Sequence, residues 1–194
     1  GSLPRFREHL AWAESSAVTF ANSVLGARTN REGGPSALAA GIIGKTPAYG
    51  LHLDENRKPT ISIDVQAEVN TMSDFGALGY TIGKQAQGQI PYITGIKNAD
   101  IDMLKTFSAS VVTYGAKPLY YIENITPEKA EMPSEKISIT KEDLQNAFNE
   151  INDEIEEIDF VFLGCPHASI KEIAEIAKEL KGKKVTSELW IGSS

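Results

Sequence analysis

The clearest pattern of apolar positions lies near the C-terminal end of the chain. Residues 160–163 form an uninterrupted apolar run, which predicts a buried strand. From Ile170 to Leu180 apolar residues recur at helical spacing, so a helix is expected directly after that strand. Ser169 and Glu172 stand at the spacing of a capping box, which sets the expected start of this helix.

Strands and helices alternate along the rest of the second half. The pattern predicts helices over residues 98–114 and 141–151, with a short helix opening at Thr126, and strands over 117–122, 137–139 and 184–191. Asn98 and Thr140 are the expected caps of the two longer helices. Such alternation favours an α/β fold of mostly parallel sheet flanked by helices.

The first half is less regular. Helices are predicted over residues 9–26, 36–43 and 73–87, and strands over 49–53, 60–66 and 90–93. The first two strands are expected to be joined as a hairpin or by another β-connection. Gly76, Gly79 and Gly83 favour close packing of the third helix against another element. We expect two regions: residues 3–96 with the helices, hairpin and a substrate loop, and residues 97–194 as a regular α/β region.

Composition narrows the class of protein. A single cysteine excludes an internal disulfide framework and favours a reducing cytoplasm. The net charge of −7 argues against a broad nucleic-acid surface. No apolar run is long enough to cross a bilayer, so we expect neither a nucleic acid nor a membrane as partner.

Cys165 lies in the loop between the predicted strand 160–163 and the helix that follows it. In open α/β sheets ligands bind at this edge, and a helix N-terminus favours the thiolate form of a cysteine. His167 stands two residues further on. A thiolate there would bind metal or attack an electrophile; the alternative is a small buried residue in a turn.

The polar, glycine-rich loop over residues 29–36 is the second candidate site. Arg31 offers a planar fork for a carboxylate or phosphate, and Gly33 lets the backbone approach a ligand. Asn30 adds hydrogen-bonding groups, and Glu32 is a candidate base or arginine partner. The alternative is a surface loop whose charges pair with one another. The loop is not a Walker motif, and the chain lacks a dinucleotide-binding glycine turn.

Two further groups are weaker candidates. Ser15 and Ser16 fall inside the first predicted helix, where small polar residues are usually just tolerated. His52 and Asp54 alternate along a predicted strand and are expected on one face of it. They suit a metal site or a proton-transfer pair, although hydrogen bonding at a strand end is more common.

Taken together, these stretches resemble the aconitase X family, specifically the large subunit of an aconitase-like hydro-lyase. The resemblance runs in order through residues 9–17, 21–36, 49–57, 76–80 and 163–169. It implies dehydration of a small hydroxy acid at an iron–sulfur cluster. The substrate is 5-phosphomevalonate in the archaeal branch, giving trans-anhydromevalonate 5-phosphate, and cis-3-hydroxy-L-proline in the bacterial branch. The C-terminal half, rich in Ile, Lys and Glu, favours the archaeal branch, so 5-phosphomevalonate is the expected substrate and cis-3-hydroxy-L-proline the alternative. A small swivelling subunit is the implied partner.

The resemblance also implies roles for particular residues. Cys165 becomes a ligand of a cluster expected to be [4Fe-4S]. The remaining candidates are catalytic residues Ser15, Ser16 and His167, and substrate-binding residues Asn30, Arg31, Glu32, Gly33 and His52. A cluster needs about three protein thiolates, and this chain has one. We therefore expect a central fragment of a larger subunit, with the other ligands elsewhere, that is inactive by itself.

Two other functions stay open at this point. One is a metal-free catalyst that uses Cys165 with His167, for which a depressed thiol pKa and rapid alkylation would be diagnostic. The other is a non-catalytic domain that binds phosphorylated or carboxylated ligands through residues 30–34. Anion binding without turnover would favour this second alternative.

Overall fold

The computed structural model describes residues 3–193 and forms two compact units, one ending at Asn149 and the other beginning at Glu150. The expected boundary after residue 96 instead lies inside the first unit, just beyond a strand of its sheet. In chain order the elements are α1 (Ser15–Ser23), α2 (Gly34–Ile43), η1 (Gly50–His52), η2 (Asp54–Arg57), β1 (Ile61–Val65), α3 (Met72–Gln85), β2 (Pro91–Thr94), α4 (Ile101–Gly115), β3 (Tyr121–Ile122), β4 (Lys136–Ile139), α5 (Lys141–Ile151), β5 (Phe160–Leu163), α6 (Ile170–Leu180) and β6 (Glu188–Ile191).

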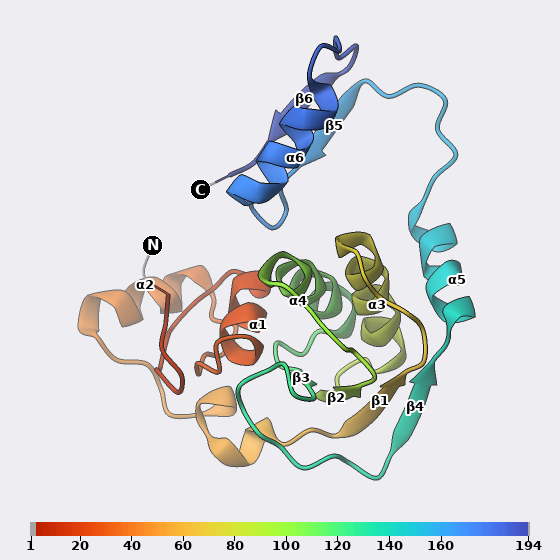
Figure 1. Cartoon of the computed structure of the whole chain (residues 1–194). Coiled ribbons are helices and arrows are strands. Elements are labelled where there is room, and N and C mark those ends of the chain that lie inside the picture. The colour runs from red at the N-terminus through yellow and green to blue at the C-terminus, as the bar shows by residue number, and fades with distance from the viewer. Residues whose placement is uncertain (1–2, 194) are drawn as a thin grey trace. The chain divides into compact units, whose positions relative to one another are not determined.

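The first unit is built on a parallel sheet with strand order β3-β2-β1-β4. Ile63 of β1 stands beside Ile93 of β2 and Ile137 of β4, so the middle of the sheet is aliphatic. Helices α1, α4 and α3 form a layer on one face (Figure 1). The α/β class with a mostly parallel sheet is therefore confirmed.

The core lies between the sheet and the layer of helices. Ile63, Phe75 and Phe107 have no exposed surface, and the two phenyl rings meet edge to face at 6.4 Å. Helices α3 and α4 approach closely because α3 carries glycines at the contact. A Cβ on Gly79 would lie 2.7 Å from Cβ of Ser110, and one on Gly83 would lie 2.8 Å from Cβ of Tyr114. The expected close packing of this glycine-bearing helix is confirmed.

Several predicted helix starts were wrong. Helix α1 begins at Ser15, not at residue 9, because the backbone around His9 pairs with Arg28 in a short parallel bridge. Helix α3 is capped by Thr71, and α4 by Asp100 in place of Asn98. Helix α5 matches the expected residues, and Thr140 and Asp143 bond reciprocally at its start.

The predicted hairpin was also wrong. Residues 50–57 form two consecutive 3₁₀ turns, η1 and η2, and β1 pairs with β2 and β4 in parallel. Only Tyr121–Ile122 of the predicted strand 117–122 joins the sheet. The expected short helix at Thr126 is irregular chain, because the Thr126 hydroxyl bonds back to both backbone groups of Ile122.

The second unit is a strand–helix–strand motif in which β5 and β6 pair in parallel and α6 connects them (Figure 1). The Ser169 and Glu172 capping box is present at the start of α6, as predicted. The expectation that β5 is buried was wrong: Phe160 and Phe162 are 48% and 51% exposed. A two-stranded sheet with one connecting helix has little material with which to cover both of its faces.

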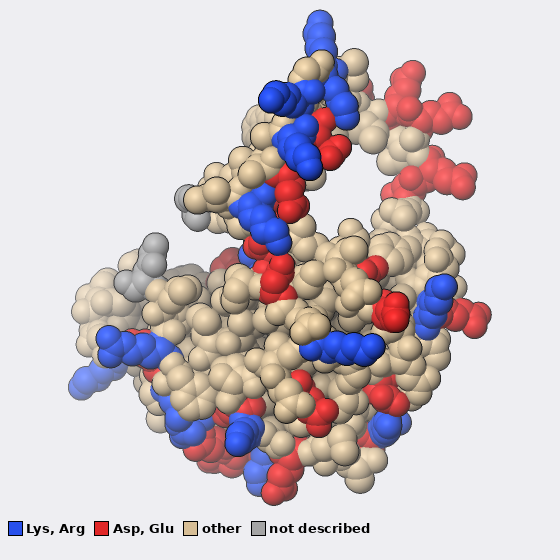
Figure 2. Space-filling model, viewed as in Figure 1, with Lys and Arg blue, Asp and Glu red and all other residues tan. Residues whose placement is uncertain are grey.

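The surface carries charged side chains of both signs. On the face shown in Figure 2, acidic and basic side chains are interspersed. Across residues 3–193, no helix is both long enough and apolar enough to span a membrane.

Candidate functional site

A buried asparagine fixes the loop that follows α1. Asn22 donates from Nδ2 to the carbonyl oxygens of Thr29 and Pro118, at 2.8 and 2.9 Å, and its Oδ1 accepts from the Thr29 amide at 3.0 Å. The loop is thus held at both backbone groups of Thr29. Sequence reasoning assigned no role to Asn22, because its partner at Pro118 lies 96 residues away.

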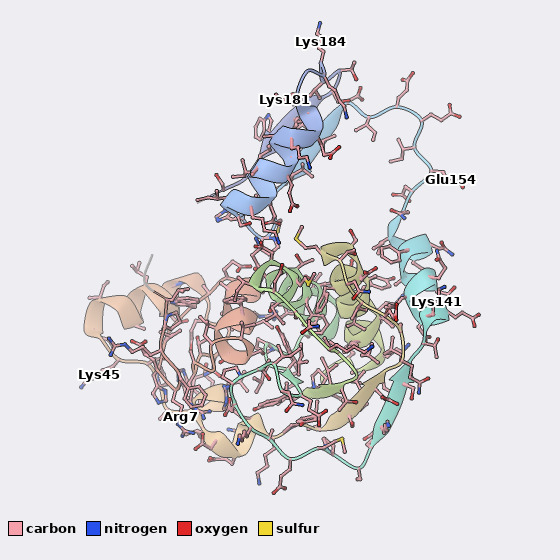
Figure 3. All side chains as sticks on the ribbon, in the orientation of Figure 1. Arg7, Lys45, Lys141, Glu154, Lys181 and Lys184 are labelled. Atoms are coloured by element: carbon pink, nitrogen blue, oxygen red, sulfur yellow. The ribbon has the colours of Figure 1, made fainter. Side chains whose placement is uncertain are left out.

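A network of ion pairs contacts Asn22, the residue that holds this loop. Arg57 is 2% exposed and forms a two-pronged ion pair with Glu128, the shorter contact being 2.6 Å. Arg28, 1% exposed, bonds to Glu128 at 3.0 Å and to Asp54 at 2.6 Å. Arg7 contacts Asp54 from outside and lies at the surface (Figure 3). These ion pairs lock η2 against the segment after β3.

Asp54 is consequently engaged with arginines. The hydrogen bond from Arg7, with the nearby charge of Arg28, holds the pKa of the Asp54 carboxyl below its usual range. The expected pairing of Asp54 with His52 on one strand face is wrong, because the two belong to separate 3₁₀ turns with different partners.

Asn30 and Arg31 are placed differently although they are adjacent. The Asn30 side chain accepts from the Leu51 amide at 2.7 Å and donates to the Tyr49 carbonyl at 3.1 Å, which holds η1 in place. Gly50 has a positive φ of +59°, and a side chain there would collide with Asn30. Arg31 is exposed and borders a cavity of about 530 Å³ together with Lys117.

Glu32 and Gly33 form the start of α2. Gly33 is the N-cap residue of that helix, and Pro35 lies in its first turn, as expected. Glu32 is 9% exposed, and its Oε2 accepts from the Ser36 hydroxyl at 2.9 Å. Its Oε1 is buried and has no hydrogen-bond partner among the described residues.

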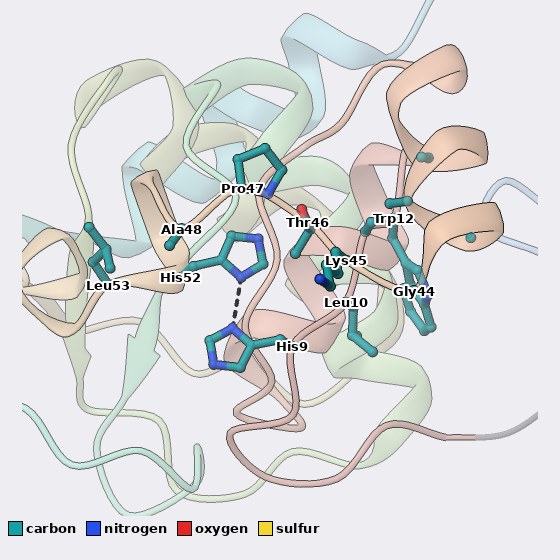
Figure 4. A pocket seen from close by; sticks show the side chains of 14 residues that line it. His9, Leu10, Trp12, Gly44, Lys45, Thr46, Pro47, Ala48, His52 and Leu53 are labelled. Carbon is teal, nitrogen blue, oxygen red and sulfur yellow. Dashed lines mark hydrogen bonds between the residues drawn. The ribbon is translucent and has the colours of Figure 1, made fainter.

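His52 is buried and paired with a second histidine. Its Nδ1 lies 2.9 Å from Nδ1 of His9, and the two rings stack with centroids 5.2 Å apart (Figure 4). Burial, and after it the charge of His9, lowers the pKa of His52. His9 was missed as a candidate, because it lies 43 residues from His52 in a segment predicted to be helical.

Ser15 and Ser16 lie at the N-terminus of α1, not in a helix interior as predicted. The carboxylate of Glu14 caps this helix, accepting from the Ser16 amide at 2.9 Å and from the Ser16 hydroxyl at 2.7 Å. The two serines therefore stand where helix amides favour a negative charge.

In the second unit, Cys165 is exposed in the loop from β5 to α6, where the sequence predicted it. The loop is tied to the end of β6, because Ala168 donates to the Gly192 carbonyl at 2.8 Å. Gly164 makes this possible: with φ at +122° it packs against Gly192, and a side chain would collide with that backbone. The Cys165–Pro166 peptide is cis, and His167 is exposed beyond it.

This chain alone does not fit an iron–sulfur cluster. Such a cluster is held by several cysteine thiolates, and the chain supplies one, Cys165. Within the described part of the chain, no group of three or more histidine, cysteine or acidic side chains is arranged to hold a metal ion. The structure gathers Asn30, Glu32 and His52 around the 3₁₀ turns of the first unit, while Cys165 and His167 share a loop of the second.

Comparison with known proteins covers almost the whole sequence. Residues 1–55 match the family model described as Aconitase X first domain, residues 59–149 the second domain and residues 158–194 the third domain. The crystal structure of Thermococcus kodakaraensis aconitase X in its holo-form has a TM-score of 0.89 with this chain, at 46% identity, over 98% of this chain and 50% of that one.

Comparison with individual curated proteins gives the same family. The phosphomevalonate dehydratase large subunit of Thermococcus kodakarensis is 47% identical over 100% of this chain and 51% of its own length. That of Methanocaldococcus jannaschii is 49% identical, with 98% and 50% covered. The cis-3-hydroxy-L-proline dehydratase of Pseudomonas aeruginosa is 36% identical, with 93% and 33% covered. This chain spans about half the length of the dehydratase large subunits it matches, and it belongs to the aconitase X family.

Proposed function

We propose that this chain is part of the large subunit of a hydro-lyase that dehydrates 5-phosphomevalonate to trans-anhydromevalonate 5-phosphate. The observation that carries this proposal is the ranking of relatives. Identity is 47% and 49% to two phosphomevalonate dehydratase large subunits over nearly the whole chain, against 36% to a cis-3-hydroxy-L-proline dehydratase. The relatives' designation as large subunits supports a small subunit as the partner.

The proposed cofactor is an iron–sulfur cluster, of the [4Fe-4S] type, with Cys165 as one ligand. The exposure of the thiol and its position before a helix N-terminus support this role. The other ligands have to come from outside this chain, because it contains a single cysteine. The isolated chain is therefore proposed to be inactive.

The exposure of each candidate side chain is the basis for its proposed role toward the substrate. Arg31 faces solvent beside a cavity and is the proposed partner of a carboxylate or phosphate, with the Gly33 backbone next to it. Asn30, Glu32 and His52 are buried or bonded to the backbone, so their proposed contribution is to hold that loop in shape. Ser15, Ser16 and His167 are the proposed catalytic candidates.

The test uses the full-length large subunit with its small subunit, purified without oxygen. Iron–sulfur absorbance is recorded, and dehydration of 5-phosphomevalonate is assayed beside cis-3-hydroxy-L-proline. We expect turnover of the phosphorylated substrate only, and loss of both cluster absorbance and turnover in Cys165→Ser. Lys184→Ala, an exposed change in the same unit, is the matched control and should retain both.

Arg31→Met separates binding from cluster assembly. We expect an unchanged cluster and a KM raised by about tenfold or more, because a charge-assisted hydrogen bond is lost. Arg5→Met, also exposed, should leave KM unchanged. A colourless assembly that is inactive on both substrates would contradict the proposed function and favour a binding domain.

A further inference from the structure

Helix α2 is apolar on every side. Its only polar side chain is that of Ser36, whose hydroxyl donates to Glu32 at 2.9 Å beside the start of the helix. The remaining residues of α2 are glycine, proline, alanine, leucine and isoleucine, and none is charged. A surface helix of a globular protein normally has a polar face, whereas a helix that is apolar all round is buried. The composition of α2 is therefore that of a core helix.

The surroundings of α2 do not match this composition. The helix lies at the periphery of the first unit, and none of its residues is buried (Figure 1). Leu38, Ile42 and Ile43 are 67%, 76% and 65% exposed. Among the described elements, no helix or strand packs extensively against α2. A helix with the composition of a core element thus exposes large aliphatic side chains to solvent.

The most exposed of these side chains share one face of α2. On its inner side, Ala37, Ala40 and Gly41 line a cavity of about 630 Å³. Successive residues of a helix are rotated by about 100°, so Leu38 and Ile42 point away from that cavity. We call this side the outer face of α2; it consists of Leu38, Ala39, Ile42 and Ile43. The outer face is therefore separate from the cavity.

The outer face does not suit a lipid bilayer. Ten helical residues rise about 15 Å, which is half of the hydrocarbon thickness of a membrane. A helix that lies in the membrane interface instead has a strongly charged polar face, and α2 has no charged residue. A protein surface is the better match for an uncharged aliphatic face.

The size of the outer face favours a segment of the same polypeptide over a separate protein. A specific interface between two proteins uses roughly 20–30 residues on each side, because association costs translational and rotational freedom. The whole of α2 has ten residues. A segment that is covalently part of the same chain does not lose that freedom when it packs, so a smaller apolar face is sufficient.

The related large subunits are long enough to contain such a segment. This chain covers 51% and 50% of two phosphomevalonate dehydratase large subunits, so about half of each relative lies outside the matched part. Leu38 and Ile42 are four residues apart and form a ridge of the kind that fits into the groove of another helix. An aliphatic helix is thus the element that this face fits.

We propose that the outer face of α2 is an internal packing surface of the large subunit. Its occupant is an uncharged, aliphatic helix face from the part of that subunit that lies outside this chain. In the full-length subunit α2 is then a buried core helix, as its composition requires. This assignment rests on the proposed function, because it takes the chain to be part of a large subunit.

The test measures how accessible α2 is in the full-length large subunit, purified without oxygen and without its small subunit. Ala39→Cys and Ile42→Cys each place a thiol on the outer face. Lys45→Cys, at an exposed position just beyond the helix, is the matched control. Each variant is treated with a maleimide, and peptide mass spectrometry measures the labelling at the introduced cysteine alone. Circular dichroism confirms that each variant is folded.

We expect both outer-face thiols to react at least about tenfold more slowly than the thiol of Lys45→Cys, because a thiol packed in a core is inert. All three should react at similar rates in urea. Ala39→Cys changes the side-chain volume least, so it provides the result if Ile42→Cys does not fold. Outer-face thiols that react as fast as the control would overturn the proposal.

The same labelling identifies the covering molecule. Protection in the large subunit alone, independent of protein concentration, supports the proposal. Protection that appears only with the small subunit, or only at high concentration, assigns the outer face to that subunit or to a second copy and overturns the proposal. Labelling requires no turnover, so protected thiols in a protein that fails to dehydrate 5-phosphomevalonate would contradict the proposed function and leave the packing surface intact.

Discussion

At the scale of single residues, buried polar side chains position the loops of the first unit. Asn22 holds Thr29 by both backbone groups, and Arg57 bonds to Glu128, to Asn22 and to the Leu51 carbonyl. Removing one partner from such a network leaves the others buried and unpaired, which costs roughly 1–3 kcal/mol for each group. These contacts therefore hold the candidate loop at Asn30 in a fixed conformation.

A pH-dependent stability is expected at the start of α5. The Asp143 carboxylate accepts from the Thr140 hydroxyl and amide at 2.6 and 2.7 Å, and these hydrogen bonds lower its pKa. Because the pKa of Asp143 is lower in the folded than in the unfolded state, ionised Asp143 stabilises the protein at pH values above its ordinary pKa of 3.8. This contribution to stability is lost as the pH falls through the folded-state pKa. Asp143→Asn should thus be less stable than the parent at pH 7 but not at pH 2.

Urea unfolding at a series of pH values measures this difference. Asp153→Asn, in the exposed segment 152–157, is the control and should change stability by less than about 0.5 kcal/mol at every pH. A parent-to-variant difference that persists undiminished below the folded-state pKa would contradict the assignment to Asp143.

At the scale of elements, the contact between α3 and α4 depends on missing side chains. Gly79→Ala places a methyl group within 3.0 Å of the Val111 backbone and 2.7 Å of Ser110 Cβ, so we expect destabilisation of about 1–3 kcal/mol from overpacking. Gly41→Ala in α2 meets nothing within 4 Å and should stabilise by up to about 1 kcal/mol through helix propensity. Urea unfolding of both variants gives the comparison, and an equal effect would refute the packing role.

At the scale of the whole chain, the two units differ in how much they bury. The first contains a cluster of fully buried aliphatic and aromatic side chains, whereas no residue of β5, α6 or β6 is buried. Backbone hydrogen bonds covered by little apolar packing open locally at low free energy. The second unit is therefore the less stable part of this chain.

Native-state hydrogen exchange checks that expectation. Amides of β5 and β6 should exchange faster than those of β1 and β2, by a factor of ten or more. The strands compared have similar lengths and the same parallel pairing, so neither feature accounts for a difference in exchange rate. Equal protection in the two sheets would show that the second unit has a core of its own.

Much of the second half of the fold was predictable, because its signals are local. Helices α5 and α6 lie where apolar spacing, the Thr140 cap and the capping box of Ser169 with Glu172 placed them, and a capping box involves residues only three apart. The Cys165 loop follows from the strand and helix on either side of it. The glycine spacing of α3 likewise predicted a close helix contact.

The first half was less predictable, because long-range contacts override local preference there. Residues 49–53 alternate like a strand, yet hydrogen bonds with the side chains of Asn30 and Arg57 hold them in a 3₁₀ turn. Residues 9–12 have helical spacing, yet their backbone pairs with residues near Arg28. Hydrophobic periodicity reports only local spacing and therefore does not predict such distant partners.

The sequence by itself determined the α/β class, the caps of α5 and α6, the position of Cys165 and membership of the aconitase X family. These depend on residue identities and short spacings. Only the tertiary structure decided that Arg28, Arg57 and His52 are buried, and that His52 faces His9 instead of Asp54. The physical reason is that burial of a polar side chain requires partners, and Arg28 meets Glu128 across 100 residues of chain only after folding.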